Sequence, residues 1–310
     1  MLQTRHLLGT DLRVSAIALG TADWTTRKGD DLDLLYSAFR EAGGNCFDSA
    51  HCYAFWKDAE GAPERELGRL IRQHGDRANV IVCTKGCHIS GGAKYPRPPR
   101  YMTAELLASD LRDSLERLQI DHIDLYYLHR DDPAVPVDEI MDALHSQQQA
   151  GRIRHYAASN WQPARLEQAA DYCRRQGIAP FVASQVLYNL GQLASPMGAD
   201  IAVLDNEQPA WYAKHQLPVF AYAATANGYF ASESNEGSYA TPTSAARRQR
   251  AATLAAELNT KPGQIALAYL MNQPFPVIPV TGTLKIDHLR DNMAAAQIRL
   301  SLQQLQFLRG

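Results

Sequence analysis

The stretch Asn45-Cys46-Phe47-Asp48-Ser49-Ala50-His51-Cys52-Tyr53 decides how the rest of the chain is interpreted. Its apolar residues Cys46 and Phe47 are typical of the end of a buried strand, which leaves Asp48 where the chain turns out of that strand. Tyr53 follows on the loop. Taken alone, an Asp at a strand end is typical of a turn or helix cap, and a loop Tyr is typical of packing. The stretch therefore needs support from elsewhere in the chain.

Three later apolar runs also end in polar side chains. These are residues 80–84 before Lys85, 123–128 before His129, and 157–158 before Ser159 and Asn160. The carboxyl ends of all strands in a parallel barrel surround one mouth, so side chains at these positions can converge there. The order of the four strand ends along the chain, more than any one residue, favours a shared site.

Composition narrows the class of protein. The chain has 310 residues, of which 45% are hydrophobic and 21% charged, with a formal net charge of −2. These values are typical of a globular protein and do not favour nucleic acid as a partner. No apolar run approaches the roughly 18 residues of a membrane span, and residues 1–10 lack the apolar core of a signal peptide. We therefore expect a cytoplasmic protein with no membrane partner, either a monomer or a weak homo-oligomer.

The cysteines do not predict a metal site. There are five, at positions 46, 52, 83, 87 and 173, and no spacing among them matches a zinc motif. We interpret them as small buried hydrophobic residues in a reducing compartment.

Strand and helix patterns alternate along the whole chain. Strands are predicted at 16–19, up to Asp48, and at 80–84, 123–128, 154–158, 181–185, 219–222 and 276–280. Helices are predicted at about 31–42, from 63, from 103, and at 137–150, 163–176, around Trp211, 245–258, 262–272 and 285–296, the last being the final packed helix. Residues 4–15 favour a β-hairpin. Eight such units in one domain, residues 1–310, predict a (β/α)8 TIM barrel with an N-terminal β-hairpin.

Three irregular segments interrupt this pattern. Residues 86–100 are rich in Pro and Gly, 190–208 show no periodicity, and 226–244 are rich in Ser, Asn, Gly and Thr. Loops of this length are commonly functional. We expect 86–100 and 226–244 to determine substrate specificity, with Trp24 and Trp161 as apolar walls of the substrate site.

The four polar groups suit carbonyl chemistry. A phenol such as Tyr53 can give a proton to a carbonyl oxygen, but its ordinary pKa of about 10 is high for this task. A nearby ammonium, Lys85, lowers that pKa, and Asp48 can hold Lys85 charged. Removal of Lys85 is expected to raise the pKa of Tyr53, and removal of Asp48 to raise it more weakly. His129 can hydrogen-bond the same carbonyl oxygen. No side chain supplies a hydride, so a reduced cofactor must do so.

The sequence resembles the aldo-keto reductase family over nearly its whole length. The matching segments are Phe47-Asp48-Ser49-Ala50 with Tyr53, Glu64-Arg65-Glu66-Leu67-Gly68, Thr84-Lys85-Gly86, Asp124-Leu125-Tyr126-Tyr127-Leu128-His129-Arg130, Gly151-Arg152-Ile153-Arg154, Ala158-Ser159-Asn160-Trp161, Phe220-Ala221-Tyr222 with Gly228, and the last β/α unit to Asn292. The resemblance implies a TIM barrel, a nicotinamide cofactor, and a catalytic tetrad of Asp48, Tyr53, Lys85 and His129, with Tyr53 as proton donor. Tyr53 and His129 would also contact the substrate.

The same resemblance implies the cofactor residues. They are Gly20, Thr21, Asp48, Ser159, Asn160, Gln185, Tyr222, Gly228, Gly282, Thr283, Lys285, His288 and Asn292. Ser159, Asn160 and Gln185 would bond the carboxamide and Tyr222 would stack on the nicotinamide. The chain departs from many members in having Ala224-Thr225 in place of a Pro-Leu pair, and in having Gly282 and His288 where the adenosine-phosphate site usually carries basic residues.

We expect NADPH as the cofactor, with NADH possible. Thr283, Lys285 and the start of the final helix can bind a phosphate, and no acidic residue within 282–286 is placed to repel it. Protonated His288 would add to the preference for NADPH, which should therefore shrink as pH rises. Three functions stay open: an aldehyde or ketone reductase, a cofactor-binding subunit that senses redox state with little turnover, and a sugar or inositol dehydrogenase. The sequence does not indicate the substrate.

Overall fold

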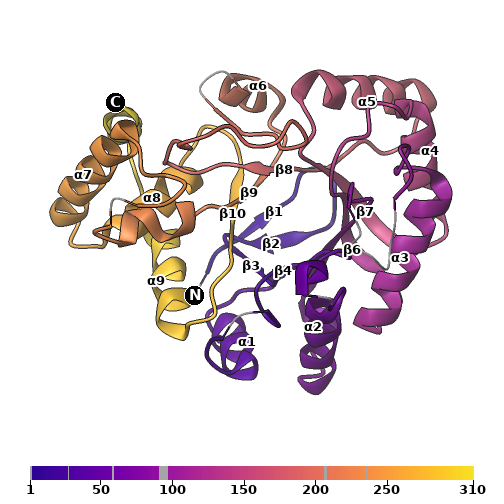
Figure 1. The fold of residues 1–310 in the computed structure, drawn as a ribbon, viewed down its shortest axis with the longest axis horizontal. Coiled ribbons are helices and arrows are strands. Elements are labelled where there is room, and N and C mark those ends of the chain that lie inside the picture. The colour runs from indigo at the N-terminus through magenta and orange to yellow at the C-terminus, as the bar shows by residue number, and fades with distance from the viewer. Residues whose placement is uncertain (1, 27, 58, 91–96, 206–207, 235) are drawn as a thin grey trace.

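Eight parallel strands close into a barrel in the order β10-β3-β4-β5-β6-β7-β8-β9 (Figure 1). The computed structural model describes residues 2–26, 28–57, 59–90, 97–205, 208–234 and 236–310. The barrel strands are β3 Ala18–Gly20, β4 Cys46–Asp48, β5 Ile81–Gly86, β6 Ile123–Leu128, β7 Ile153–Ser159, β8 Ser184–Leu187, β9 Val219–Tyr222 and β10 Val277–Thr281. The predicted fold class is therefore confirmed.

Helices surround the barrel. They are α1 Leu32–Glu41, α2 Ala62–Gln73, α3 Ala104–Leu118, α4 Val137–Gln149, α5 Pro163–Gln176, α6 Gln208–His215, α7 Pro242–Glu257, α8 Pro262–Met271, α9 Ile286–Ala294 and α10 Leu302–Arg309. Short 3-10 helices lie at η1 Phe55–Lys57, η2 Arg77–Asn79, η3 Ala226–Ala231 and η4 Ala295–Gln297. None of the helices within the described ranges combines the length and the apolar composition needed to cross a bilayer.

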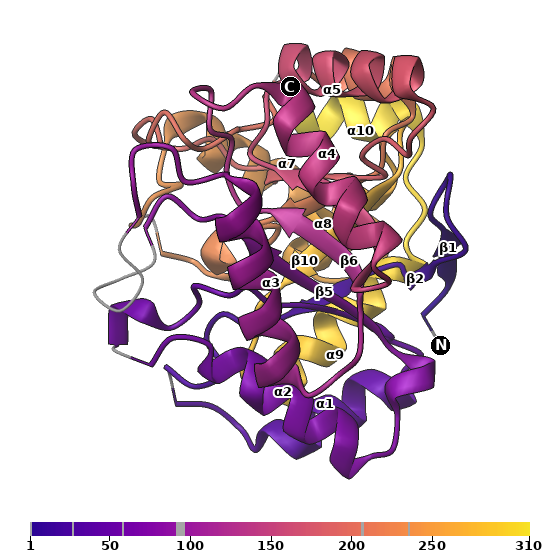
Figure 2. The same ribbon diagram turned by 90° about the vertical axis from the view of Figure 1, so that its right-hand side faces the viewer.

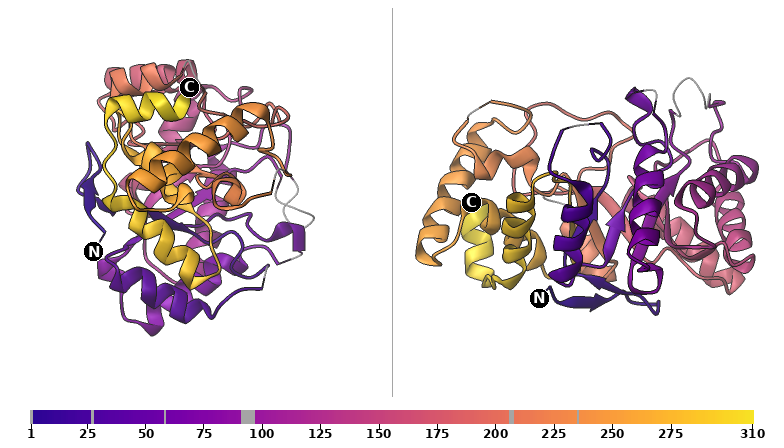
Figure 3. Two further views of the ribbon diagram at one scale, coloured as in Figure 1. Left: turned by 90° about the vertical axis from the view of Figure 1, so that its left-hand side faces the viewer. Right: turned by 90° about the horizontal axis from the view of Figure 1, so that it is seen from below.

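The predicted hairpin closes one end of the barrel. Strands β1 Thr4–His6 and β2 Arg13–Ser15 pair antiparallel, and they lie at the edge of the molecule in Figures 2 and 3. The buried side chains of Leu7, Leu12 and Val14 belong to the same apolar cluster as residues inside the barrel, such as Phe220. This packing fills the barrel interior, so the open mouth lies at the carboxyl ends of the strands.

The helices pack on the barrel through a second, larger apolar cluster. The strands are buried on both faces, which is why they appear in the sequence as continuous apolar runs. Helices α2 and α3 approach closely at Gly68, where a Cβ atom would lie 2.3 Å from the backbone oxygen of Leu118. A glycine is therefore needed at this crossing.

Three predicted boundaries are wrong. Strand β8 begins at Ser184, not at residue 181, because the Phe181 ring packs against Tyr156 and Trp161 before the strand ladder begins. Helix α7 begins at Pro242, where Thr241 caps it, so the preceding loop is shorter than predicted.

The third error is at the C-terminus, where α10 follows the helix predicted to be last. Ser301 and Gln304 form a reciprocal capping box at its start, with Ser301 Oγ accepting from the Gln304 N–H at 3.2 Å and Gln304 Oε1 from the Ser301 N–H at 2.9 Å. This pattern is visible in the sequence. Within the irregular segments predicted above, residues 91–96, 206–207 and 235 lie outside the described residues.

Candidate active site

Lys85 lies at the centre of the polar cluster at the barrel mouth. It is the last residue but one of β5. Its Nζ donates to Asp48 Oδ2 at 2.7 Å, to the backbone oxygen of Ser49 at 2.7 Å and to Tyr53 Oη at 3.0 Å. These contacts use all three protons of the ammonium. Gln185 holds the other carboxylate oxygen, because its Nε2 donates to Asp48 Oδ1 at 2.9 Å. The structure thus brings three of the four predicted catalytic side chains into direct contact.

The charges of this cluster set the protonation states. Burial would lower the pKa of Lys85, but the Asp48 carboxylate and Tyr53 outweigh burial and raise that pKa above its ordinary value. Burial raises the pKa of the Tyr53 phenol, Lys85 opposes this shift, and the Asp48 carboxylate adds to it. At neutral pH the cluster therefore contains an ammonium, a carboxylate and a neutral phenol, which is the form that can donate a proton.

His129 lies beside the phenol. The two rings are 5.9 Å apart and close to perpendicular. The Nδ1 atom of His129 is 3.5 Å from Cys52 Sγ, and the ring of His88 is 4.7 Å from that of His129. Burial, followed by the positive fields of His88 and Lys85, lowers the pKa of His129 well below its ordinary value. The ring is neutral at physiological pH and carries one N–H.

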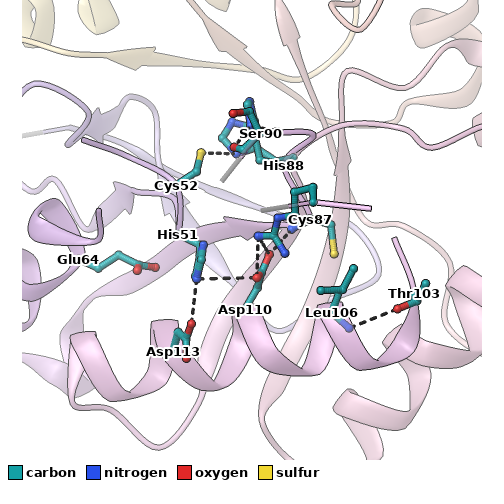
Figure 4. A network of polar contacts seen from close by, with 12 residues as sticks. His51, Cys52, Glu64, Cys87, His88, Ser90, Thr103, Leu106, Asp110 and Asp113 are labelled. Carbon is teal, nitrogen blue, oxygen red and sulfur yellow. Dashed lines mark hydrogen bonds and ion pairs between the residues drawn. The ribbon is translucent and has the colours of Figure 1, made fainter. Parts of the chain in front are cut away.

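A buried polar network holds the loop that carries Tyr53 (Figure 4). His51 Nε2 lies 3.2 Å from Asp113 Oδ2 on α3, and Arg117 Nη1 donates to the backbone oxygen of His51 at 2.8 Å. Arg117 also pairs with Glu64 at 3.2 Å, and Glu64 accepts from Thr84 Oγ1 at 2.7 Å. Because the network ties the loop to α2, α3 and β5, it fixes where the phenol points.

The floor of the mouth is built from the ends of β3 and β4. Gly20 pairs with Asp48 in the parallel ladder, and Thr21 Oγ1 donates to the backbone oxygen of Asp48 at 3.2 Å and to Ser49 Oγ at 2.9 Å. Gly20 and Thr21, both predicted cofactor residues, therefore lie directly next to the Lys85 cluster.

The residues predicted to bind a carboxamide lie on the other side of the mouth and contact one another. Asn160 Nδ2 donates to Ser159 Oγ and to the backbone oxygen of His129, both at 3.1 Å. Its Oδ1 accepts from the Tyr222 hydroxyl at 2.8 Å and from the Ala202 N–H at 3.2 Å. A ligand amide would have to exchange some of these partners. The Asn160 backbone has a positive φ of 62°, a conformation that Asn adopts more readily than most residues.

A large cavity of about 1520 Å³ contains the remaining predicted cofactor residues. Its lining includes Gly228, Gly282, Thr283, Lys285, His288 and Asn292. It also includes basic side chains that the sequence prediction missed, among them Lys28 and Arg248. Arg248 donates to the backbone oxygens of Ser232 and Ser234, at 3.1 and 2.6 Å, and its guanidinium lies 4.6 Å from the centre of the Tyr229 ring. Arg248 lies on α7, before the last strand, and the sequence around residues 282–292 carries no signal for it.

The start of α9 differs from expectation. Asp30, from the loop before α1, accepts a hydrogen bond from the Ile286 N–H at 2.8 Å. An acidic group thus caps the helix end that was predicted to bind phosphate, although none lies within residues 282–286. The cavity lining itself contains three acidic residues, Asp23, Glu233 and Asp291, of which Asp291 pairs with Lys261 at 2.7 Å.

The two tryptophans predicted as substrate walls are both buried. Trp161 is fully buried, packs against Phe181, and donates its Nε1 proton to the backbone oxygen of Arg130 at 3.0 Å. Trp24 is 4% exposed and packs edge-on against Phe47.

Two further aromatic residues, Phe55 and Trp56, lie near Tyr53. Trp56 is 48% exposed, and its ring is 6.4 Å from that of Tyr53. Phe55 lies between Trp56 and His88, with ring separations of 5.4 and 6.1 Å. Their position could be expected from the sequence, because both residues follow closely after Tyr53 in the same loop.

Comparison with known proteins agrees with the resemblance seen in the sequence. The family model described as "Aldo/keto reductase family" matches residues 16–309. An uncharacterized oxidoreductase, YrpG, of Bacillus subtilis is 29% identical over 98% of this chain and 94% of its own length. An aryl-alcohol dehydrogenase [NADP(+)] of Phanerodontia chrysosporium is 28% identical over 97% and 83%. A probable voltage-gated potassium channel subunit beta of Oryza sativa is 25% identical over 96% and 92%.

Proposed function

The chain belongs to the aldo/keto reductase family, and on that premise we propose that it transfers a hydride between a nicotinamide cofactor and an aldehyde or ketone. The observation that carries this proposal is the Lys85 ammonium, buried and bonded to Asp48 and Tyr53, with the neutral His129 ring beside the phenol. A cluster of this kind can transfer one proton to or from a single oxygen atom of a substrate.

Each side chain has a distinct task in the proposed reduction. Tyr53 donates its phenolic proton to the carbonyl oxygen as negative charge develops there, and Lys85 stabilises the phenolate that remains. Asp48 keeps Lys85 charged and in place. His129 donates its N–H to the carbonyl oxygen and so fixes the angle of the carbonyl group. A bound reduced nicotinamide supplies the hydride, which no side chain can provide.

The residues around the mouth fit such a cofactor. Ser159, Asn160 and Gln185 offer amide and hydroxyl groups for a carboxamide, and Tyr222 offers a ring face. At the far end, Thr283, Lys285, His288 and Asn292 line the cavity of about 1520 Å³, large enough for a nucleotide. Gly282 and Gly228 keep this cavity open, since no atom lies within 4 Å of a Cβ built at either.

We propose NADPH as the preferred cofactor. The cavity lining carries Lys28, Arg248, Lys261 and Lys285 as well as His288, against three acidic residues, Asp23, Glu233 and Asp291, the last of which pairs with Lys261. A surplus of basic groups favours a 2′-phosphate, which carries nearly two negative charges. The kcat/KM ratio of NADPH to NADH, measured at about pH 6 and pH 8.5, tests this. A clear preference for NADH at either pH would contradict it, and a ratio that does not change with pH would remove His288 from the phosphate site.

We further propose that the substrate is an apolar, aromatic carbonyl compound. A half-exposed indole next to the proposed proton donor is an apolar surface that a flat ring can cover. The name of the Phanerodontia chrysosporium relative agrees with this class.

Oxidation of NADPH by paired carbonyl compounds tests both proposals. Benzaldehyde is expected to give a kcat/KM at least ~10-fold above propanal, because burial of an aromatic ring is worth more than 1.4 kcal/mol. Trp56→Ala should reduce this ratio by raising the KM for benzaldehyde, while propanal serves as the control. Equal kcat/KM values for benzaldehyde and propanal would refute the aromatic substrate class but not the reduction of carbonyl compounds. Tight binding of NADPH with no turnover of any carbonyl compound would instead favour the cofactor-sensing subunit.

A further inference from the structure

Cys52, His88 and His129 form a three-ligand cluster, of which the proposed reduction uses only His129. Among the residues that the structure describes, these three present Sγ and two imidazole nitrogens within 4.8 Å of one another. They come from three different segments: the loop after β4, the residues that follow β5, and the end of β6. Their distance along the chain explains why no spacing in the sequence predicts a metal site.

The separation of the donor atoms suits a tetrahedral ion. With a Zn–S bond of about 2.3 Å and a Zn–N bond of about 2.05 Å, the S···N edge of a tetrahedron is about 3.6 Å. Cys52 Sγ and His129 Nδ1 are 3.5 Å apart. The ring of His88 is 4.7 Å from that of His129, and all three donor atoms lie within 4.8 Å of one another, so His88 would have to move closer to complete the third corner.

The surroundings of His88 resemble those of a metal ligand. Its Nδ1 lies 2.5 Å from the backbone oxygen of Ser90 and 3.0 Å from the Ser90 backbone nitrogen, and the tautomer of the ring decides which of the two it bonds. In the tautomer that donates from Nδ1 to the oxygen, Nε2 has a free lone pair, and metal-bound histidines are commonly held by a carbonyl oxygen in this way. Cys52 and His129 are buried, whereas His88 is partly exposed, so an ion has a path from solvent. Figure 4 shows Cys52 and His88 on the same side of the network, away from Asp113.

We propose that Cys52, His88 and His129 bind a borderline-soft divalent cation, of which Zn²⁺ is the type, with one open coordination position facing the mouth. Binding replaces the Cys52 S–H bond by an S–Zn bond, and the thiol proton leaves to the buffer. No electron is transferred. A sulfur and two imidazole nitrogens favour zinc over magnesium or calcium, which prefer oxygen ligands.

Titration of the chelator-treated full-length protein with Zn²⁺ tests the site. We expect one zinc per chain by competition with a chromophoric chelator, and an X-ray absorption spectrum with one sulfur and two nitrogen ligands. Cys52→Ser and His88→Gln should each weaken binding by at least ~100-fold. Cys173→Ser, which changes a buried thiol on α5, is the matched control and should leave the affinity unchanged.

Circular dichroism of the zinc-free variants shows whether they are folded. If Cys52→Ser does not fold, His88→Gln decides, because His88 is partly exposed. No saturable binding by the wild-type protein, full affinity in His88→Gln, or a spectrum without sulfur would overturn the proposal. The readout is zinc rather than turnover, so it is independent of whether the protein reduces carbonyl compounds.

Discussion

Replacement of Asp48 by Asn tests how charge is distributed around the proposed proton donor. The sequence predicts that Asp48 acts only through Lys85, so that its loss raises the pKa of Tyr53. In the structure, the Asp48 carboxylate also acts on Tyr53 directly and raises the pKa of the phenol. As long as Lys85 remains charged, Asp48→Asn is therefore expected to lower the pKa of Tyr53, the opposite sign to the sequence-based prediction.

The size of this shift follows from two distances. The oxygens of Asp48 and Tyr53 bond the same Nζ at 2.7 and 3.0 Å, so they lie at most about 5.7 Å apart. At an effective dielectric constant of about 20, two unit charges at that distance interact with about 2.9 kcal/mol, or about 2 pKa units. Tyr53 is partly open to solvent, and screening reduces the expected shift to about 1–2 units.

The assay is the pH dependence of kcat for carbonyl reduction. Tyr53 must be protonated to act, so the rate falls as pH rises through its pKa. In the wild-type protein this fall is expected above about pH 10, because burial raises the pKa of the phenol. In Asp48→Asn it should begin about 1–2 units lower. Lys85→Met is the control with opposite sign, since it removes the positive charge that stabilises the phenolate. A fall at higher pH in Asp48→Asn than in the wild type would refute this account of the charges.

Three further predictions concern the proton donor, the cofactor and the fold. Tyr53→Phe should lower kcat by ~10²–10⁴-fold with little change in cofactor affinity, and turnover within a few-fold of wild type would exclude Tyr53 as the acid. Asp30→Asn keeps an acceptor for the N–H at the start of α9 but removes a negative charge, so the ratio of kcat/KM for NADPH to that for NADH should rise roughly 2–5-fold. An unchanged ratio would mean that Asp30 does not act on the bound 2′-phosphate. Gly68→Ala should lower the free energy of unfolding by about 1–3 kcal/mol in urea titration, because its Cβ would meet Leu118; unchanged stability would mean that α2 and α3 separate easily.

The contacts around Lys85 could be predicted from the sequence, because residues at the ends of different strands lie close together in this fold. Asp48, Lys85 and His129 each lie at or just after the end of a strand, and the strands of a closed parallel barrel end around one mouth. No knowledge of loop conformation is needed to bring such residues together. The same rule does not apply to side chains that lie beyond the strand ends, because their direction depends on how each turn bends.

Trp161 and Trp56 illustrate this limit. Trp161 immediately follows the polar end of β7, yet its ring is buried and its N–H is used by a backbone oxygen. Trp56 lies three residues beyond Tyr53, in a short 3-10 helix that leaves its ring half exposed. Apolar character alone predicts a buried ring in both cases. The difference arises from backbone geometry, including the positive φ of Ala54 just before that helix.

The phosphate end of the cavity shows why local sequence is insufficient for cofactor preference. Residues 282–286 contain no acidic side chain, and on that basis the start of α9 offers an uncontested site for an anion. The chain brings Asp30 to the same N–H group from more than two hundred residues away, and it brings Arg248 to the cavity from α7. The two charges have opposite effects on a 2′-phosphate. Since Arg248 already donates to two backbone oxygens and Asp30 accepts from one N–H, the preference depends on which of them exchanges its partner more readily when a phosphate arrives.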